Sequence, residues 1–358
     1  MIRERGDMLN QAVLEQLTDA IASRGGATPA VKFQQFYDVL NELFTAEEAE
    51  IAVKLPLEAI TAVQIAQLTG TKDTGTLIQT LEAMADKGLL LADKLGGNTT
   101  YKLLPLIPGM FEFQFLKGAT GERERKIILL IHEYIKALTQ AAAAAKKTGT
   151  SEKKRVVHLD ELVSQIAVIH SYAEIMDLID KTEDIAVGTC MCRLRGEIVG
   201  RPCDKPKELC MMFGPEAKAA TARGIVRMVS KDEARKLFDQ AEESALVHQS
   251  MYHQGGFIEF LCNCCVCHCA TLKGIYRSPV PSLAAIVKHV IEIDKGSCLG
   301  CGDCVPRCQM EAIKMDGDEL RLDANRCIGC GLCMYACPAD SLKLIKRDNP
   351  WAAMLPGH

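Results

Sequence analysis

Two cysteine runs with the same spacing constrain this 358-residue chain more than any other feature. The first run is CLGCGDCVPRC at residues 298–308, and the second is CIGCGLCMYAC at residues 327–337. Both follow the pattern C-x2-C-x2-C-x3-C, which places three thiolates around one 4Fe-4S cubane and leaves the fourth for a second cubane. A short strand-like segment follows each run, so the two halves form a sequence repeat. The pattern therefore predicts two iron–sulfur clusters in a repeated fold.

We expect the fourth cysteine of each run to bind the cluster of the other run. Glycines within the runs let the backbone approach the cluster closely. Zinc ribbons match poorly, because their C-x2-C pairs are separated by a longer loop. Gln309 stands where such sequences usually have proline, and we expect it to change only local rigidity or hydrogen bonding. The expected ligands are Cys298, Cys301, Cys304 and Cys337 for the first cluster, and Cys327, Cys330, Cys333 and Cys308 for the second.

Nine further cysteines form a second constellation upstream of these runs. Four or five ligands suffice for a 4Fe-4S cluster, so this set could hold one or two more. Two zinc sites and reduced structural cysteines are the alternatives, whereas compartment and crowding disfavour disulfides. Adjacent cysteines cannot all face one cluster, so we expect at least one downstream thiol to lie outside it. The candidates are Cys190, Cys192, Cys203, Cys210, Cys262, Cys264, Cys265, Cys267 and Cys269, with His268 as a ligand or as a hydrogen-bonding neighbour of a sulfur.

Positive charge accompanies the upstream half of this constellation. It would offset the negative charge of a cluster and raise its reduction potential. Because each half looks like half of a metal site, we expect the two halves to meet in space. The basic residues are Arg193, Arg195, Arg201, Lys205 and Lys207.

From about Ile185 to Leu344 the chain resembles the 4Fe-4S dicluster, ferredoxin-type proteins of strict anaerobes. In these proteins a CxCR…C…P…C…FG segment and a CNCCxCxC segment precede a two-cluster ferredoxin module, and many carry a winged-helix-like N-terminal region. The resemblance implies electron transfer within a larger oxidoreductase system and leaves the terminal substrate open. The matching residues are Cys190, Cys192, Arg193, Cys203, Pro206, Cys210, Phe213, Gly214 and Cys262 through Cys269.

The sequence predicts an α+β multidomain protein. Residues 1–150 are expected to form a helical, winged-helix-like domain, in which short helices precede a hairpin around the turn Gly96-Gly97-Asn98. Residues 151–292 are expected to form an α/β, cysteine-rich middle domain, and residues 293–348 the two-cluster ferredoxin domain. Residues 349–358 are a tail.

Local signals predict where several elements begin and end. Thr45 and Asp73 or Thr74 are expected to open helices, and Gly70 to stop a helix that starts at Ile60. Longer helices are expected at 122–145, at 280–290, and from a capping box at 230–233. Residues 257–261 are expected to form a strand. The basic segment 146–155 is expected to be a solvated linker, with docking of an acidic partner as the alternative.

Charge and hydropathy narrow the functional class. The formal net charge is -4, which argues against a generic binder of nucleic acid or anionic membrane. The N-terminus lacks the apolar core of a secretory signal, and no apolar run is long enough to span a bilayer. A chain with 17 cysteines and these features is expected to be cytoplasmic and metal-binding rather than stapled by disulfides.

Electron transfer to or from a partner oxidoreductase is the function that the sequence favours, with no catalytic residue assigned. An iron–sulfur redox sensor that regulates transcription is one alternative, and a catalytic site at the middle cysteines is another. Between Phe36 and Pro105 the chain has ten acidic and five basic residues, too few positive charges for phosphate contacts. We therefore expect the N-terminal domain to dock larger oxidoreductase subunits through its apolar helices and the stripe from Ile127 to Leu138.

Overall fold

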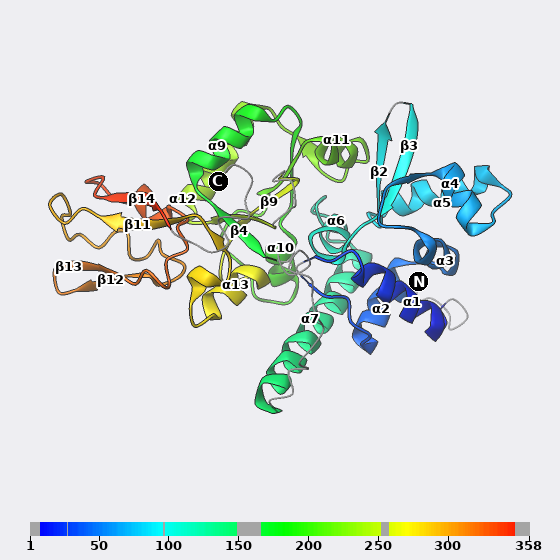
Figure 1. The fold of residues 1–358 in the computed structure, drawn as a ribbon, viewed down its shortest axis with the longest axis horizontal. Coiled ribbons are helices and arrows are strands. Elements are labelled where there is room, and N and C mark those ends of the chain that lie inside the picture. The colour runs from blue at the N-terminus through cyan, green and yellow to red at the C-terminus, as the bar shows by residue number, and fades with distance from the viewer. Residues whose placement is uncertain (1–7, 27, 96, 149–165, 252–257, 348–358) are drawn as a thin grey trace. The chain divides into compact units, whose positions relative to one another are not determined.

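The computed structural model describes residues 8–26, 28–95, 97–148, 166–251 and 258–347 (Figure 1). The chain divides into two compact units. The first contains residues 1–162 with 197–201 and 219–226, and the second contains 163–196, 202–218 and 227–358. Most of the expected middle domain, apart from residues 151–162, 197–201 and 219–226, thus belongs to one compact unit with the expected ferredoxin domain. Among the described residues, no helix combines the length and apolarity needed to cross a membrane.

The first unit combines helices with a small antiparallel sheet. Strand β3 lies between β1 and β2, so the hairpin and the strand that precedes α4 form one sheet. The segment Leu106–Met110 then leads through the short α6 into the long α7. The elements are α1 (Gln11–Ala22), α2 (Gln34–Leu43), α3 (Ala46–Lys54), β1 (Ile60–Thr61), α4 (Ala62–Thr69), α5 (Thr74–Asp86), β2 (Leu90–Leu95), β3 (Asn98–Leu103), α6 (Phe111–Phe113) and α7 (Glu122–Thr148).

Side-chain caps explain where these helices begin. Thr45 accepts a hydrogen bond from the backbone N–H of Glu48 in a capping box, as predicted for the start of α3. Asp73 caps α5, and Gly70 ends α4 in a left-handed conformation with φ of 75°, which glycine adopts at little cost. The predicted helix from Ile60 instead starts at Ala62, because Thr61 is its N-cap.

The apolar stripe on α7 was expected to be a docking surface, but its isoleucines are not exposed. Ile127, Ile128 and Ile131 are fully buried. The ring of Tyr134 stacks on Phe36 of α2 with 4.8 Å between ring centroids. These apolar side chains therefore form the core of the first unit. The linker predicted at 146–155 begins inside α7, because α7 continues to Thr148. Residues 149–155 of the predicted linker lie outside the described residues.

A seven-stranded sheet forms the centre of the second unit, in the order β10-β4-β8-β9-β6-β5-β7. Only the β10–β4 pair is parallel. The strands are β4 (Ala167–His170), β5 (Ile185–Gly188), β6 (Cys210–Phe213), β7 (Arg227–Met228), β8 (Val247–Met251), β9 (Phe260–Cys264) and β10 (Ile286–Val287). The helices are α9 (Tyr172–Lys181), α10 (Met191–Ile198), α11 (Pro215–Ala222), α12 (Lys231–Glu243) and α13 (Ala270–Arg277).

The two faces of this sheet have different environments. Helices α9 and α12 cover one face, where Ile179 and Phe238 pack with Phe213 and Leu261 in one apolar cluster. Side chains alternate between faces along a strand, so the cysteines next to these apolar residues point to the opposite face. Cys210, Cys262 and Cys264 are placed there by the register of β6 and β9.

Three sequence predictions for the second unit need comment. Ser230 caps α12 as predicted, but the Glu233 carboxylate pairs with Arg227 at 2.7 Å, away from the cap. The strand predicted at 257–261 begins at Phe260 and continues to Cys264. The predicted helix at 280–290 is wrong: a 3-10 turn (Pro281–Leu283) is followed by β10 and by β11 (His289–Ile293). The β-branched residues of this segment favour strands, and β10 pairs with β4 whereas β11 pairs with β14 (Leu342–Lys346).

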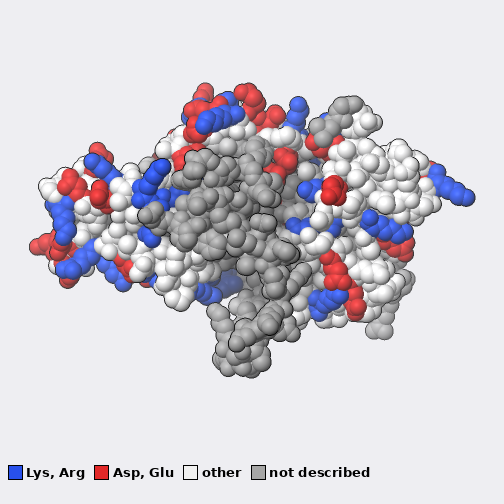
Figure 2. Space-filling view, in the orientation of Figure 1, with Lys and Arg blue, Asp and Glu red and all other residues white. Residues whose placement is uncertain are grey.

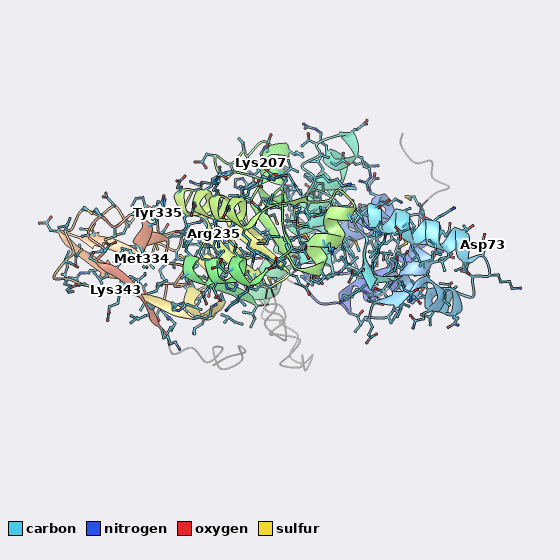
Figure 3. The ribbon with its side chains drawn as sticks, turned by 90° about the horizontal axis from the view of Figure 1, so that it is seen from above. Asp73, Lys207, Arg235, Met334, Tyr335 and Lys343 are labelled. Carbon is cyan, nitrogen blue, oxygen red and sulfur yellow. The ribbon has the colours of Figure 1, made fainter. Side chains whose placement is uncertain are left out.

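The described ferredoxin part contains two antiparallel strand pairs and one short helix. Strand β11 (His289–Ile293) pairs with β14 (Leu342–Lys346), and β12 (Ile313–Asp316) pairs with β13 (Glu319–Leu322). Helix α14 (Leu332–Tyr335) carries Met334 and Tyr335, labelled in Figure 3. Leu272 and Ile275 of α13 share one apolar core with the ferredoxin part. The predicted tail at 349–358 lies outside the described residues.

Candidate metal centres

The thiols expected to bind the first cluster line one cavity. Cys298, Cys301, Cys304 and Cys337 all contribute to its wall, together with Pro338 and other residues of both repeats. Burial, together with the charges of Cys301, Cys337 and Cys298, raises the pKa of Cys304 to about 11. The crossed arrangement expected from the sequence, with one thiol from the second run, is therefore present in the geometry.

The second set of four thiols is more deeply placed. Cys327 and Cys333 are buried, and Cys330 and Cys308 are half-buried. Burial raises the pKa of Cys333 well above its usual range, and the charges of Cys330, Cys308 and Cys327 act in the same direction. Cys308, the fourth thiol of the first run, also raises the pKa of Cys327 and of Cys330, which places it beside the first three thiols of the second run.

The two crossing thiols are met by equivalent hydrogen-bond donors. The backbone N–H of Ala312 donates to Cys308 Sγ over 3.2 Å. The backbone N–H of Ser341 lies 3.4 Å from Cys337 Sγ, and its hydroxyl lies 3.1 Å away. Burial raises the pKa of Cys337, but these donors outweigh it and leave the pKa below its ordinary value. Donors of this kind stabilise thiolate ligands and tune the potential of a cluster.

Two equivalent glycines are required by close backbone packing. Gly300 has φ of 66°, and a Cβ there would lie 2.7 Å from the carbonyl oxygen of Asp318. Gly329 has φ of 62°, and a Cβ there would overlap the carbonyl oxygen of His289. The glycines thus allow each cysteine loop to pack against a neighbouring strand or turn.

Six of the other nine cysteines come together on one side of the central sheet. The thiols interact pairwise in the order Cys190–Cys192–Cys269–Cys264–Cys262–Cys210, which joins the two predicted halves. We call these residues the six-thiol set. Cys190 and Cys192 flank the start of α10, Cys210, Cys262 and Cys264 lie on adjacent strands, and Cys269 caps α13.

Hydrogen bonds give two members of the six-thiol set thiolate character. Bonds from Cys192 and Cys264 lower the pKa of Cys269 well below its usual range. Cys269 Sγ also lies 3.6 Å from Gln249 Nε2 and 3.4 Å from the backbone nitrogen of Leu272. Bonds from Cys210 and Cys264 likewise lower the pKa of Cys262. Thiolates are the form that binds metals.

Arg193 is a buried positive charge beside the six-thiol set, and the charge of Arg195 acts on Cys192 of the same set. The side chain of Arg193 is 1% exposed, and its Nη1 donates to the carbonyl oxygen of Asn263 over 2.9 Å. Its Nε and Nη2 atoms are buried without a hydrogen-bond partner. Burial lowers the pKa of Arg193, but the charges of Cys190, Cys265 and Cys264 raise it above its ordinary value. A buried cation with unused donors beside six thiols fits an anionic metal–sulfur cluster.

The remaining three cysteines form a compact group with His268, which we call the Cys3His set. Cys203 Sγ lies 3.9 Å from Cys265 Sγ and 3.8 Å from Cys267 Sγ. His268 Nδ1 lies 3.1 Å from Cys267 Sγ and 4.0 Å from Cys265 Sγ. All four ligand atoms lie within 4.8 Å of one another. The expectation that adjacent thiols separate is met, because Cys264 and Cys265 belong to different sets.

Gln309 connects the ferredoxin part to the cysteine-rich segment 262–269 through hydrogen bonds. Its Nε2 donates to the carbonyl oxygen of Cys264 over 3.0 Å, and its Oε1 accepts from the backbone N–H of Val266 over 2.6 Å. It also donates to the carbonyl oxygen of Ala245. The residue that replaces the usual proline therefore fixes one cysteine loop beside another, a larger role than the local one expected from the sequence.

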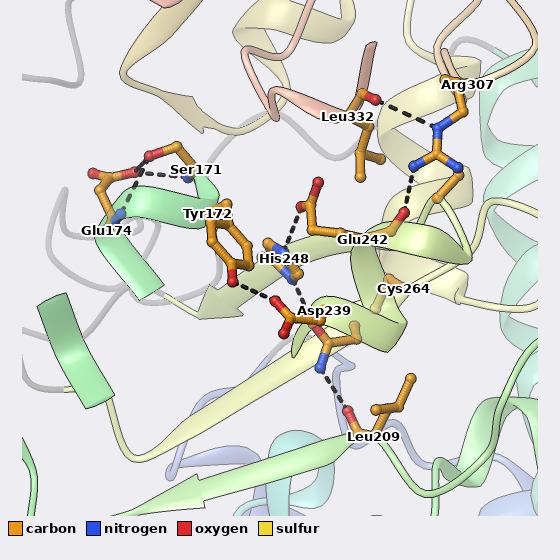
Figure 4. Close-up of polar contacts among 12 residues, drawn as sticks. Ser171, Tyr172, Glu174, Leu209, Asp239, Glu242, His248, Cys264, Arg307 and Leu332 are labelled. Carbon is orange, nitrogen blue, oxygen red and sulfur yellow. Dashed lines mark hydrogen bonds and ion pairs between the residues drawn. The ribbon is translucent and has the colours of Figure 1, made fainter. Parts of the chain in front are cut away.

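A buried polar network contacts the cysteine-rich segment 262–269 from the other face of the sheet. This network was not predicted from the sequence. His248 Nε2 lies 2.9 Å from Glu242 Oε1 (Figure 4), and its Nδ1 lies 2.5 Å from Asn263 Oδ1. Asn263 Nδ2 donates to the carbonyl oxygen of Leu209 over 2.9 Å. Arg307 donates to the backbone carbonyls of Glu242 and Leu332 (Figure 4). The available signal was Asn263 itself, a polar residue between two cysteines of a buried strand.

Comparison with known families gives one match. A family model described as a 4Fe-4S dicluster domain matches residues 291–344. No curated protein and no solved structure matched the chain. The match supports 4Fe-4S clusters and iron–sulfur electron transfer as the general chemistry of a ferredoxin-type domain.

Substitution of Gly329 tests the packing that places the second cluster. Gly329→Ala should displace the Cys327 loop, because the added methyl group overlaps the His289 carbonyl. We expect a loss of up to about four iron atoms per chain, the content of one cluster, by anaerobic iron and sulfide analysis. Gly317→Ala is the matched control, since Gly317 also has φ of 62° but a Cβ there meets nothing within 4 Å. Equal iron contents in the two variants would contradict this account.

Proposed function

We propose that the chain is an electron-transfer subunit that relays electrons between its two ferredoxin clusters and one further 4Fe-4S cluster on the six-thiol set. Bound clusters supply one-electron carriers. The ferredoxin-domain match supports the first two clusters. The buried, incompletely paired guanidinium of Arg193 is the observation that carries the third.

The contacts of Gln309 support a relay between the second ferredoxin cluster and the six-thiol set. Gln309 follows the cluster ligand Cys308 directly, and its side chain donates to the carbonyl of Cys264 at 3.0 Å. One residue therefore spans from a ferredoxin ligand to a member of the six-thiol set. A short, hydrogen-bonded path of this kind favours electron transfer between redox centres.

The first ferredoxin cluster supplies the contact with an external redox partner in this proposal. Cys301 is exposed, and Leu299 in the same cysteine loop is 71% exposed. None of the four thiols of the second set is exposed. An electron would enter or leave through the first cluster and pass inward through the second.

The first unit is proposed to be a winged-helix-like domain that docks a larger oxidoreductase subunit. Helices α3, α4 and α5 precede the β2–β3 hairpin, the element order of that domain type. Helix α5 contains no lysine or arginine, which disfavours phosphate contacts. Val63 and Leu68 on α4 and Ile78 on α5 are exposed. The side of α4 and α5 that is visible in Figure 2 is mostly uncharged. Asp73 at the start of α5 adds negative charge (Figure 3).

The proposal places the protein in the cytoplasm of an anaerobic cell. The structure contains 17 free cysteines, which suits a reducing compartment. The resemblance to ferredoxin-type proteins of strict anaerobes supports the same setting.

Arg193 provides the direct test of the third cluster. Arg193→Gln should lower the reduction potential of that cluster, because the reduced form carries more negative charge and loses a buried cation. EPR-monitored redox titration of the anaerobic full chain measures this shift. Arg193→Lys keeps the charge and should show a smaller shift, and Arg201→Gln, at an exposed position, should show none. Three variants with unchanged potentials, or shifts confined to the ferredoxin signals, would contradict the assignment.

Surface substitutions test the docking role. Val63→Glu combined with Ile78→Glu should reduce co-purification of partner subunits from native cells at least as clearly as deletion of residues 1–150. Leu129→Glu is the matched control, since Leu129 is 49% exposed on α7, away from α4 and α5 in the sequence. Sequence-specific DNA binding that switches with cluster oxidation state in gel-shift assays would instead favour a redox-sensing regulator.

A further inference from the structure

The Cys3His set has the donor types and the close spacing that one metal ion requires. Zinc binds thiolate sulfur at about 2.3 Å and imidazole nitrogen at about 2.0–2.1 Å in a tetrahedron. Those bond lengths place two sulfurs about 3.8 Å apart and a sulfur and a nitrogen about 3.5 Å apart. The distances of 3.9 and 3.8 Å from Cys203 Sγ to the other two sulfurs match the tetrahedral value. The distances of 3.1 and 4.0 Å from His268 Nδ1 to two sulfurs lie on either side of the expected value of about 3.5 Å.

The other cysteines of the chain provide an internal comparison. A polynuclear cluster places several iron atoms between its ligand sulfurs, so these sulfurs are spread farther apart than around one ion. Among the described residues, the Cys3His set alone has three or more candidate ligand atoms within 4.8 Å of one another. Such a close grouping of four ligand atoms fits one ion.

The loop that supplies three of the four ligands is held by contacts that do not depend on a metal. The backbone N–H of Cys269 donates to the carbonyl oxygen of Cys265 over 3.0 Å, which closes the turn. Lys273 Nζ donates to the carbonyl oxygen of Cys267 over 2.9 Å. Gln309 accepts from the backbone N–H of Val266 over 2.6 Å. Such support orients ligands before a metal binds.

We infer that Cys203, Cys265, Cys267 and His268 bind one structural zinc ion. Four protein ligands close the coordination shell, which is typical of structural rather than catalytic zinc. The ion would join the loop that carries Cys203 to the turn at 265–268. It would thereby keep Cys265 away from the six-thiol set, to which its neighbour Cys264 belongs.

Metal analysis and X-ray absorption of the full chain test this inference. Protein purified anaerobically from medium containing iron and zinc should contain about one zinc per chain. Zinc-edge EXAFS should show three sulfurs at about 2.3 Å and one nitrogen at about 2.0–2.1 Å. Absence of zinc, or a shell of four sulfurs, would overturn the inference.

Variants assign the ion to these residues. Cys267→Ala, at an exposed position, and His268→Ala should each lower zinc at least fivefold and leave iron unchanged. Cys301→Ala, at an exposed ferredoxin ligand, is the matched control and should lower iron but keep zinc. His268→Cys should retain zinc and change the shell to four sulfurs, so the test holds even if an alanine variant misfolds. Iron loss from Cys267→Ala with zinc retained would assign the set to an iron–sulfur cluster and contradict the proposal.

Discussion

Burial of negatively charged sulfur is the constraint on which the second unit depends. Thiolates packed closely together repel one another, and removal from water raises their pKa unless cations or hydrogen-bond donors compensate. In the ferredoxin part the donors are backbone N–H groups and the hydroxyl of Ser341, which keep the pKa of Cys337 low. Around the six-thiol set, hydrogen bonds from neighbouring thiols lower the pKa of Cys262 and Cys269, and the buried guanidinium of Arg193 adds a positive charge.

The same constraint explains why the cysteine-rich segment 262–269 is held by hydrogen bonds on two sides. Asn263 and His248 hold it on the sheet face covered by α12, and Gln309 holds it from the ferredoxin part. Alternation along β9 and the turn after it then direct neighbouring thiols to different sets. Most of the expected middle domain therefore lies in one unit with the ferredoxin part, and α13 packs into a core that both share.

Spacing alone predicted the crossed grouping of the eight ferredoxin cysteines, because three of each four ligands are close in sequence. Caps at Thr45 and Asp73 were also predictable, since they depend on local hydrogen bonds. The division of the other nine cysteines was not, because it depends on the register that places Cys210 opposite Cys262. Strand pairing with β4 and β14 likewise determined the secondary structure of segment 280–290. Packing against α2 buried the apolar stripe on α7. Local periodicity encodes neither contact.

The iron content of the intact chain tests the central claim most directly. Anaerobically purified protein should contain about 12 iron and 12 acid-labile sulfide per chain, four of each for each of three 4Fe-4S clusters. EPR of the reduced protein should show a cluster signal beyond the interacting pair of the ferredoxin part, and Cys192→Ala combined with Cys264→Ala should remove it selectively. A content of about eight iron that the double variant leaves unchanged would contradict the account.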